Sequence, residues 1–461
     1  MTEAIRFHGR AHDARSLALQ VLLDSGRHDG FVQELLDRHL TAETARGLSP
    51  ADRRLATQLS YGVLRRRGTL RALLTPLVSR SPDNVEPWLW DALQLGAYQL
   101  ALLTQVPAHA AIHETVELAA RFGRPRAKGF LNAVLRSFSA LVTPDRADGP
   151  AADALPLEGG AYRKLAQPVL PDPETSPVEY LACGFGLPGW LASRWLERFG
   201  RDEAFRLGSW FAGPASLTLR VNPLRTTREA FLAALTAAGW HAEPGVHPQA
   251  VRLREHAAVR ELPGYQEGWF CVQDESAMRV ASAVDPQPGW RVLDLCAAPG
   301  GKATHLAELM RDEGRIVACD IDPGRLKTVS ELATRLRLKS VEADRQQTEV
   351  TEDGFDAALI DVPCGNTGVL GKRPEVRSRL RMEDIKHLVV VQRRLLKTAV
   401  ERVKPGGVVV YSTCSIEPEE NAGLVRGILS AHGGLRLEAE QESSPGCPAD
   451  GGYWARLRKA S

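Results

Sequence analysis

The chain has 461 residues, of which 44% are hydrophobic and 25% charged, the balance of an ordinary globular protein. The formal net charge is only +2, so the overall charge does not by itself indicate a nucleic-acid-binding protein. The sequence has no run of about 18 apolar residues, and its first residues lack an apolar core. We therefore expect neither a membrane span nor a secretion signal.

Seven cysteines are spread widely along the chain, and no two of them form a C-x-x-C pair. The odd number and the wide spacing argue against a disulfide framework and against a zinc site, so we expect no metal. Free thiols favour a reducing compartment, and we expect the protein in the cytoplasm. The seven are Cys183, Cys271, Cys296, Cys319, Cys364, Cys414 and Cys447.

Residues 1–140 are predicted to form an all-α domain. Apolar residues recur at helical spacing, no segment has the period of a strand, and Ser49 followed by Pro50 is typical of a helix start. The stretch from Trp88 to Leu103 is apolar nearly all round, as a helix central to a bundle would be. Residues 141–177 are rich in Pro, Gly and Asp and are predicted to be a linker.

Residues 178–275 mix helical and strand-like patterns and predict a small α+β subdomain, in which residues 216–222 alternate like a strand. From residue 276 to 461, strand and helix patterns alternate, which predicts a doubly wound parallel sheet. The expected strands are 291–295, 315–319, 340–341, 356–360 and 408–411. The expected helices are 304–311, 323–336, 382–403 and 419–431.

The first of these strands leads into a glycine-containing loop, Cys296 to Gly301, and then into a helix that starts at Lys302. Such a loop lets the backbone approach a ligand closely. The loop is neither G-x-G-x-x-G nor a Walker motif, and Asp294 before it suits a cationic methionine end, so we expect S-adenosylmethionine. Asp320, at the end of the next strand, suits the ribose hydroxyls, and Asp344 suits the adenine amine or caps a loop.

Cys364 in DVPCGNTGVL and Cys414 in YSTCSIEPEEN each follow a buried strand, and strand ends of an open parallel sheet converge on one crevice. Two thiols beside a methyl donor suit cytosine-5 methylation, in which a thiolate adds to carbon 6 so that carbon 5 can accept a methyl group. Asp361 lies three positions before Cys364 and suits the ring nitrogen. The chemistry leaves open which thiol attacks, and a lone cysteine is more often a small buried apolar residue.

A resemblance to a known family is carried by the strings VQDESAM, LDLCAAPGGK, ACDIDPGRL, DVPC and YSTCSIEPEEN, between Val272 and Asn421. The chain resembles the Sun family of S-adenosylmethionine-dependent RNA cytosine-5 methyltransferases. The resemblance implies that Cys414 is the nucleophile and that Cys364 assists product release. The cofactor residues that it implies are Cys296, Ala297, Ala298, Pro299, Gly300, Gly301, Lys302, Asp320, Asp344 and Asp361.

The N-terminal strings VPAHAAIHETVELAARFG and KGFLNAVLRSF are similar to the NusB-type RNA-binding fold, which accompanies the type that acts on bacterial 16S ribosomal RNA. The expected architecture is therefore an all-α NusB-like domain, a small α+β subdomain and an α/β Rossmann-like methyltransferase domain. The family pattern is usually Asp-Ala-Pro-Cys-Ser, whereas this chain has Val362 and Gly365. A further departure is Ser378, where many relatives carry tryptophan.

We expect RNA, 16S rRNA first, as the partner of a monomeric enzyme. Transfer RNA and large-subunit rRNA are the alternative substrates, and an RNA-binding ribosome-assembly protein with a vestigial methyltransferase core is the alternative class. The arginines that follow Cys364, namely Arg373, Arg377 and Arg379, are candidates for holding the RNA backbone. For the runs at 65–67 and at 377, 379 and 381, phosphate binding and a solvated helix face are both open.

Overall fold

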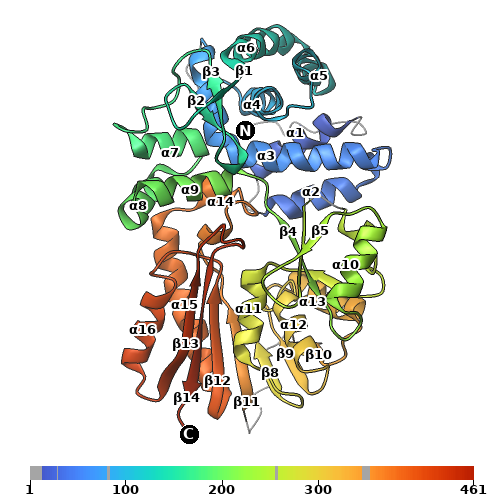
Figure 1. Cartoon of the computed structure of the whole chain (residues 1–461), viewed down its shortest axis with the longest axis vertical. Coiled ribbons are helices and arrows are strands. Elements are labelled where there is room, and N and C mark those ends of the chain that lie inside the picture. Colours follow the sequence, from blue (N-terminus) through green and yellow to red (C-terminus); the bar gives the residue numbers. More distant parts are fainter. Residues whose placement is uncertain (1–12, 28–29, 80–83, 255–257, 345–353) are drawn as a thin grey trace. The chain divides into compact units, whose positions relative to one another are not determined.

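The computed structural model describes residues 13–27, 30–79, 84–254, 258–344 and 354–461 (Figure 1). The chain divides into two compact units. The N-terminal unit comprises Met1–Ala215 together with Leu370–Arg379, and the C-terminal unit comprises Ser216–Val369 and Leu380–Ser461. A ten-residue stretch of the C-terminal half of the sequence therefore belongs to the N-terminal unit.

The N-terminal unit begins with a helical bundle, as predicted. Its helices are α1 (Ala14–Ser25), α2 (Val32–Thr41), α3 (Pro50–Leu74), α4 (Pro87–Leu102), α5 (Ala108–Arg121) and α6 (Lys128–Leu141). Ser49 caps α3, where its side chain accepts a hydrogen bond from the Asp52 amide and Asp52 reciprocates. Helix α4 contacts α1, α3, α5 and α6 and buries most of its residues, so the prediction of a central helix is confirmed.

The stretch predicted to be a linker folds instead into a three-stranded antiparallel sheet. Its strands are β1 (Val142–Ala147), β2 (Ala154–Pro156) and β3 (Tyr162–Leu165), in the order β1-β3-β2. Ala154, Leu155 and Leu165 are buried, which gives this sheet an apolar side of its own. Four helices complete the unit: α7 (Pro177–Phe185), α8 (Gly189–Phe199), α9 (Arg201–Ala212) and α14 (Val376–Arg379).

A small four-stranded antiparallel sheet opens the C-terminal unit, in agreement with the predicted α+β character. Its elements are β4 (Leu217–Val221), α10 (Arg228–Ala237), β5 (Ala242–Pro244), β6 (Ala250–Leu253) and β7 (Phe270–Val272). The strand order is β5-β6-β4-β7. Phe231 of α10 stacks on Phe270 of β7 with ring centroids 5.0 Å apart, which holds the helix against the sheet.

A seven-stranded sheet forms the core of the C-terminal unit, with the strand order β10-β9-β8-β11-β12-β14-β13. The strands are β8 (Arg291–Asp294), β9 (Arg315–Ala318), β10 (Val341–Ala343), β11 (Phe355–Asp361), β12 (Val403–Thr413), β13 (Leu435–Ser443) and β14 (Gly452–Lys459). The first five are parallel, as predicted. The C-terminal hairpin was not predicted, and its β14 runs antiparallel to both neighbours, so the sheet is mixed.

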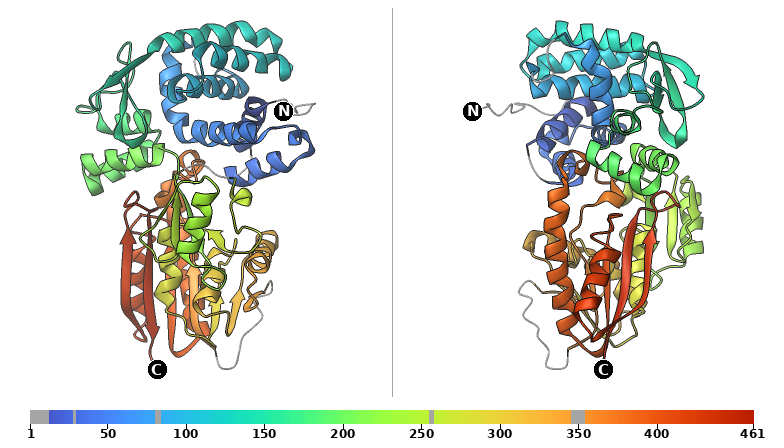
Figure 2. Two further views of the ribbon diagram at one scale, coloured as in Figure 1. Left: turned by 45° about the vertical axis from the view of Figure 1, so that its right-hand side comes forward. Right: turned by 90° about the vertical axis from the view of Figure 1, so that its left-hand side faces the viewer.

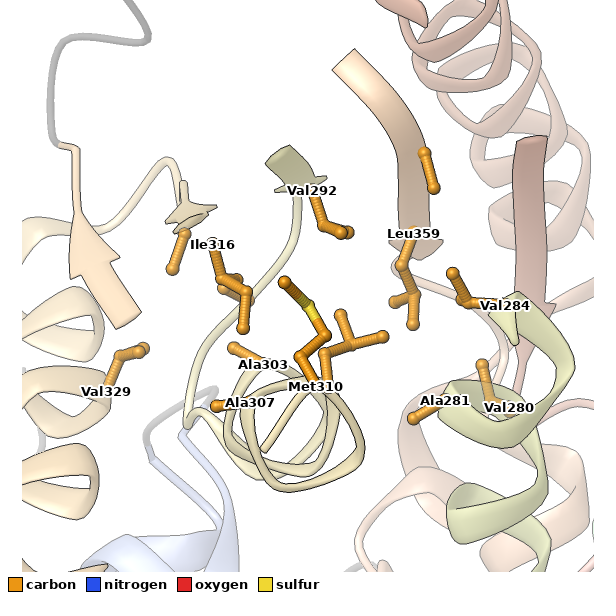
Figure 3. Packing of buried hydrophobic residues seen from close by; sticks show 14 of the residues in the cluster. Val280, Ala281, Val284, Val292, Ala303, Ala307, Met310, Ile316, Val329 and Leu359 are labelled. Carbon is orange, nitrogen blue, oxygen red and sulfur yellow. The ribbon is translucent and has the colours of Figure 1, made fainter. Parts of the chain in front are cut away.

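Helices cover both faces of this sheet (Figures 1 and 2). They are α11 (Glu275–Val284), α12 (Gly301–Leu309), α13 (Pro323–Leu336), α15 (Met382–Arg402) and α16 (Ala422–Ala431). On one face, Met310, which directly follows α12, and Val284 of α11 pack on Val292 and Leu359 of the strands (Figure 3). On the other face, α15 and α16 pack on the alternate strand residues, for example Ala358 beside Leu359. The sheet is thus buried on both sides, as a parallel core requires.

Candidate active site

Three neighbouring strands deliver the predicted site residues to one edge of the sheet. Strands β8, β11 and β12 are adjacent and parallel, with Leu359 paired to Asp294 and Asp361 paired to Ser412. Their carboxyl ends lead respectively into the glycine-containing loop, the Cys364 loop and the Cys414 loop. The expected convergence of these three segments is therefore present.

The two cysteines predicted to carry the chemistry are in contact. Their Sγ atoms lie 3.2 Å apart, a hydrogen-bond distance that is far longer than the roughly 2.05 Å of a disulfide. The hydrogen bond with Cys414 and the burial of the side chain raise the pKa of the Cys364 thiol well above its usual range. Cys364 is therefore held as a neutral thiol that can donate to Cys414. Asn366, which sequence reasoning missed, accepts from Cys414 Sγ through its Oδ1 at 3.2 Å.

The other cysteines have a different setting. Burial raises the pKa of Cys296 and of Cys271, and it raises the pKa of Cys319 to about 12. None of the seven cysteines is in a disulfide. A buried thiol with a raised pKa is a poor nucleophile, so the surroundings of these three thiols fit a structural role.

The loops that carry Cys364 and Cys414 are fastened to one another. The Gly368 amide donates to the Cys414 carbonyl at 3.0 Å, and the Thr367 hydroxyl shares a 3.0 Å hydrogen bond with Ser415. Asn421 accepts from the Thr413 hydroxyl at 2.6 Å and donates to the Ser415 carbonyl at 2.9 Å. The motif residues that follow Cys414 thus shape the loop on which its thiol stands.

Asp361 stands at the end of β11 between two partners. One carboxylate oxygen lies 2.6 Å from Lys302 Nζ, and the other accepts from the Ser412 hydroxyl at 2.8 Å. Burial by itself lowers the pKa of Lys302, but the charges of Asp361 and Cys414 outweigh it and the pKa is raised. Lys302 is therefore held as a cation on Asp361 at this edge of the sheet. From the sequence, Lys302 was expected only as part of the cofactor loop, and its contact with Asp361 was not predicted.

The cofactor loop, Cys296–Lys302, runs from β8 into the first turn of α12. Gly300 has φ of 106°, and a Cβ there would come within 3.0 Å of the Cα of Val329 in α13, so only glycine fits. The Ala297 amide bonds to the Cys319 carbonyl, and the Ala298 amide donates to Asp320 Oδ2 at 3.2 Å. These contacts hold the loop against the end of β9.

Three acidic side chains around this loop fit a ligand with a cationic end and several donors. Asp294 is fully buried, neither of its oxygens makes a hydrogen bond of normal geometry to a described residue, and burial raises its pKa to about 7. A cation placed there would offset an uncompensated charge. Asp320 also accepts from the Asp322 amide at 3.0 Å and keeps free lone pairs, while Asp344 follows β10. The residues present therefore fit the expected S-adenosylmethionine.

The predicted role of the arginines after Cys364 is not supported by their surroundings. The guanidinium of Arg377 is buried within the N-terminal unit, where it donates to the carbonyls of Phe185, at 2.7 Å, and of Phe211. Arg379 donates to the carbonyls of Gly30 and Ser25, and Arg373 lies over the ring of Phe31. Arginines engaged in this way are parts of the fold rather than ligands for phosphate.

The arginine run in α3 is also neither a phosphate site nor a solvated face. Arg65 and Arg66 are buried, and Arg65 donates to the Gly371 carbonyl at 2.7 Å. Burial lowers the pKa of Arg66 to about 10. Both alternatives for this run failed because charge patterning in a sequence does not reveal which charges are buried.

No group of three or more His, Cys, Asp or Glu side chains among the described residues is arranged to hold a metal ion. None of the described helices is long and apolar enough to cross a membrane.

In this sheet a glycine-containing loop follows β8, and a pair of thiols lies just after β11 and β12. This strand order and these site features define a Rossmann-like methyltransferase. Residues 281–450 match the family model described as 16S rRNA methyltransferase RsmB/F. Residues 12–140 match the NusB family, and residues 187–260 match the ferredoxin-like domain of the RsmF/B-like methyltransferases. The chain belongs to the RsmB/F family of 16S rRNA methyltransferases and is an RNA methyltransferase.

Curated relatives and solved structures resemble the chain over most of its length. A probable ribosomal RNA small subunit methyltransferase B of Synechocystis sp. is 37% identical over 440 residues, which cover 94% of this chain and 92% of the relative. The ribosomal RNA small subunit methyltransferase B of Serratia proteamaculans is 34% identical, over 96% of this chain and 97% of its own. The crystal structure of PH0851 is 25% identical, with a TM-score of 0.77 over 97% of this chain and 98% of its own. A methyltransferase homolog from Pyrococcus horikoshii is 27% identical, with a TM-score of 0.55 over 62% of this chain and 99% of its own.

Proposed function

We propose that this enzyme methylates carbon 5 of a cytosine in small-subunit ribosomal RNA, through a transient covalent bond between Cys414 and carbon 6 of the base. The observation that carries the proposal is the 3.2 Å contact between the thiols of Cys364 and Cys414 at the ends of neighbouring strands. The names of the curated relatives, which are small-subunit rRNA methyltransferases, support this choice of RNA. The cytoplasm keeps such thiols reduced and is the proposed site of action.

Two features support Cys414 rather than Cys364 as the nucleophile. Cys364 is held as a thiol by its raised pKa, which the hydrogen bond with Cys414 and burial produce. Cys414 is instead less buried than Cys364, and it interacts electrostatically with Lys302. A thiolate is the attacking form of cysteine, so the sulfur that has a cation and a thiol donor around it is the better nucleophile.

The residues of the site then divide the steps between them. The Cys414 thiolate forms a bond to carbon 6, and the electron pair of the C5–C6 double bond becomes available at carbon 5. Asp361, held by Lys302 and Ser412, is an acceptor for the hydrogens of the cytosine edge while the ring charge changes. Once carbon 5 carries the methyl group, its proton passes to solvent water, the C5–C6 double bond re-forms and the C6–S bond breaks. The sulfur of Cys414 leaves with its electron pair, and the Cys364 thiol donates a hydrogen bond to it.

The proposed methyl donor is S-adenosylmethionine, and the residues of this chain that would hold it are those of the loop Cys296–Lys302 with Asp294, Asp320 and Asp344. When bound, it supplies the electrophilic methyl group that carbon 5 takes up. The uncompensated carboxylate of Asp294 supports a cationic ligand, and the free lone pairs of Asp320 support hydroxyl donors.

An assay of the wild-type protein tests the substrate. Tritium transfer from labelled S-adenosylmethionine is measured on 16S rRNA, 23S rRNA and tRNA, and the methylated base is identified after nuclease digestion. We expect transfer to 16S rRNA and 5-methylcytosine as the product. Transfer to 23S rRNA or tRNA alone would replace the proposed substrate, and RNA binding without any transfer would favour a ribosome-assembly protein with an inactive core.

Cysteine variants test the proposed assignment of the thiols. Cys364→Ala is expected to accumulate an RNA adduct that survives denaturing gel electrophoresis, because the departing Cys414 sulfur loses its donor. Cys414→Ala is expected to form no adduct and to transfer no methyl group. Cys447→Ala, at an exposed cysteine, serves as the control and should behave as wild type. An adduct in Cys414→Ala and none in Cys364→Ala would reverse the two roles.

A further inference from the structure

The turn that carries Cys364 is held on both sides by two buried side chains. Gln392 of α15 donates from Nε2 to the Pro363 carbonyl at 2.9 Å. Glu420, in the segment between β12 and α16, accepts from the Gly365 amide at 2.8 Å through Oε1. The same oxygen accepts from Gln392 Nε2 at 2.8 Å, so the two side chains are joined to one another. The peptide groups that flank Cys364 are thereby fixed to one rigid unit, which we name the Glu420–Gln392 clamp.

The clamp is itself anchored in the core of the sheet. Glu420 and Gln392 are both 0% exposed, and the Tyr411 hydroxyl of β12 donates to the Glu420 main-chain carbonyl at 2.6 Å. Glu420 Oε1 thus has two donors, whereas its Oε2 makes no hydrogen bond of normal geometry to a described residue. A Cβ on Gly365 would come within 3.0 Å of Oε2, so glycine permits this close approach. Burying an incompletely bonded carboxyl group is costly, which an apolar residue here would avoid.

The proposed mechanism gives this arrangement a purpose. The thiol of Cys364 acts on the sulfur of Cys414 across 3.2 Å, and misplacing a reacting group by about 1 Å can cost on the order of a hundredfold in rate. The Cys414 loop has a fastening of its own, Asn421, which accepts from the Thr413 hydroxyl and donates to the Ser415 carbonyl. Loosening the clamp therefore moves Cys364 and leaves the attacking thiol in place.

We propose that Glu420 and Gln392 are positioning residues that align the Cys364 thiol for the release of the methylated base from Cys414. The inference rests on the proposed function and adds two residues that the motif strings alone do not assign. It separates the site into a part that forms the adduct and a part that resolves it. The oxygen of Glu420, rather than its charge, performs the task, because it joins the Gly365 amide to the Gln392 amide.

The test compares single-turnover methyl transfer with multiple turnover, and measures the fraction of RNA in the denaturant-resistant adduct. Glu420→Met and Gln392→Met should each lower multiple turnover by about tenfold, the upper end of the effect of losing one buried hydrogen bond. Single-turnover transfer should stay within about twofold, and the adduct should accumulate as in Cys364→Ala. Glu420→Gln keeps the acceptor oxygen and should restore turnover. Glu419→Met, at the exposed neighbouring position, is the matched control and should turn over as wild type.

Wild-type turnover without adduct in both methionine variants would overturn the inference. So would an equal loss of single and multiple turnover, and so would a Glu420→Gln variant as slow as Glu420→Met. Calorimetric binding of S-adenosylmethionine checks that each variant is folded. If Glu420→Met does not fold, the turnover and adduct of Gln392→Met test the inference. Cys364→Ala on the same gel separates a failure of the proposed function from a failure of the positioning role. If Cys364→Ala traps no adduct, the proposed function itself fails, whatever the clamp variants do.

Discussion

Asp294 is the site residue whose charge the protein compensates least. It lies at the end of β8, fully buried, and its two oxygens have no hydrogen bond of normal geometry to a described residue. Burial raises the pKa of this carboxyl group from 3.8 to about 7, with Lys302 opposing the shift and the charge of Asp361 adding to it. Without a ligand, the group is thus mostly protonated below about pH 7 and mostly ionised above it. A cationic ligand group favours the ionised form, so binding and ionisation are linked.

The affinity for S-adenosylmethionine should therefore depend on pH in a definite direction. Below pH 7, binding must first remove a proton from Asp294, so the dissociation constant should rise by about tenfold from pH 7.5 to pH 6. Calorimetry in buffers of different ionisation enthalpy should also detect the released proton at pH 6. Asp294→Asn should bind weakly and lose this part of the pH dependence, while the ionisation of the ligand's own amino group, near pH 8, remains. An equal wild-type affinity at pH 6 and pH 7.5 would contradict the argument.

For single residues, the motif strings located the two thiols, the cofactor loop and the acidic residues. Each of them lies within a few positions of a strand end, and periodicity reveals the strands. The motif strings did not reveal Asn366 and Gln392, because Asn366 is 48 residues from its partner Cys414 and Gln392 is 29 residues from its partner Pro363, and such contacts leave no local pattern. They also misled for Arg377, whose alternate spacing with Arg379 suggested a phosphate-binding set. Its guanidinium is buried on main-chain carbonyls, a use that side-chain spacing cannot indicate.

Between elements, a fully buried ion pair in the C-terminal unit joins β4 to α12. Arg220 and Glu308 are both 0% exposed, and two guanidinium nitrogens meet the two carboxylate oxygens at 2.8 and 2.9 Å. Arg220 also donates to the Gly301 carbonyl at 2.6 Å and to the Thr304 hydroxyl at 3.1 Å. The small sheet is thus bonded to the first turn of the helix that follows the cofactor loop.

Arg220→Met should destabilise the protein strongly, because it leaves the Glu308 carboxylate buried without its cation. The expected loss is about 3–5 kcal/mol in the free energy of unfolding, measured by urea denaturation. The double variant with Glu308→Met should recover part of this loss, since no unpaired charge remains. Arg254→Met, which removes an exposed arginine from its pair with Glu243, is the control and should leave the unfolding midpoint unchanged. A double variant no more stable than Arg220→Met would show that the ion pair is not the cause.

The same strand shows what periodicity can and cannot predict. The alternation of residues 216–222 predicted β4, but alternation alone does not show that the polar face, with Arg220, is buried as well. That face packs on α12, because the small sheet is covered on this side as well. The hairpin of β13 and β14 also alternates, in LRLEAEQES and GYWARLRK, and was missed because the expectation of a parallel sheet left no place for it. The three-stranded sheet after α6 was hidden by turn-forming residues that lie between short strands.

Over the whole molecule, the segment Leu370–Arg379 breaks the correspondence between sequence order and compact units. The chain leaves the C-terminal unit after Val369, and it returns at Leu380. The turn Thr367–Val369 just before the segment is bonded to the Cys414 loop. Within the N-terminal unit, the segment is held by its own arginines on main-chain carbonyls and by Arg65 on the Gly371 carbonyl. A fragment that starts at Ser216 therefore contains the segment without the residues that bind it.

Trypsin should distinguish the intact chain from the fragment 216–461. In the intact chain, Arg377 and Arg379 are bound within a folded unit and should be protected, whereas in the fragment they should be cut at least about tenfold faster. The cleavage sites and rates are measured by mass spectrometry over a time course, with cleavage after Arg436 on β13 as the reference. Equal protection of Arg377 and Arg379 in both proteins, with an unchanged reference rate, would mean that the segment folds without the N-terminal unit. Faster cleavage confined to these two arginines would mean that the N-terminal helical unit completes the fold of the chain that directly follows the Cys364 loop.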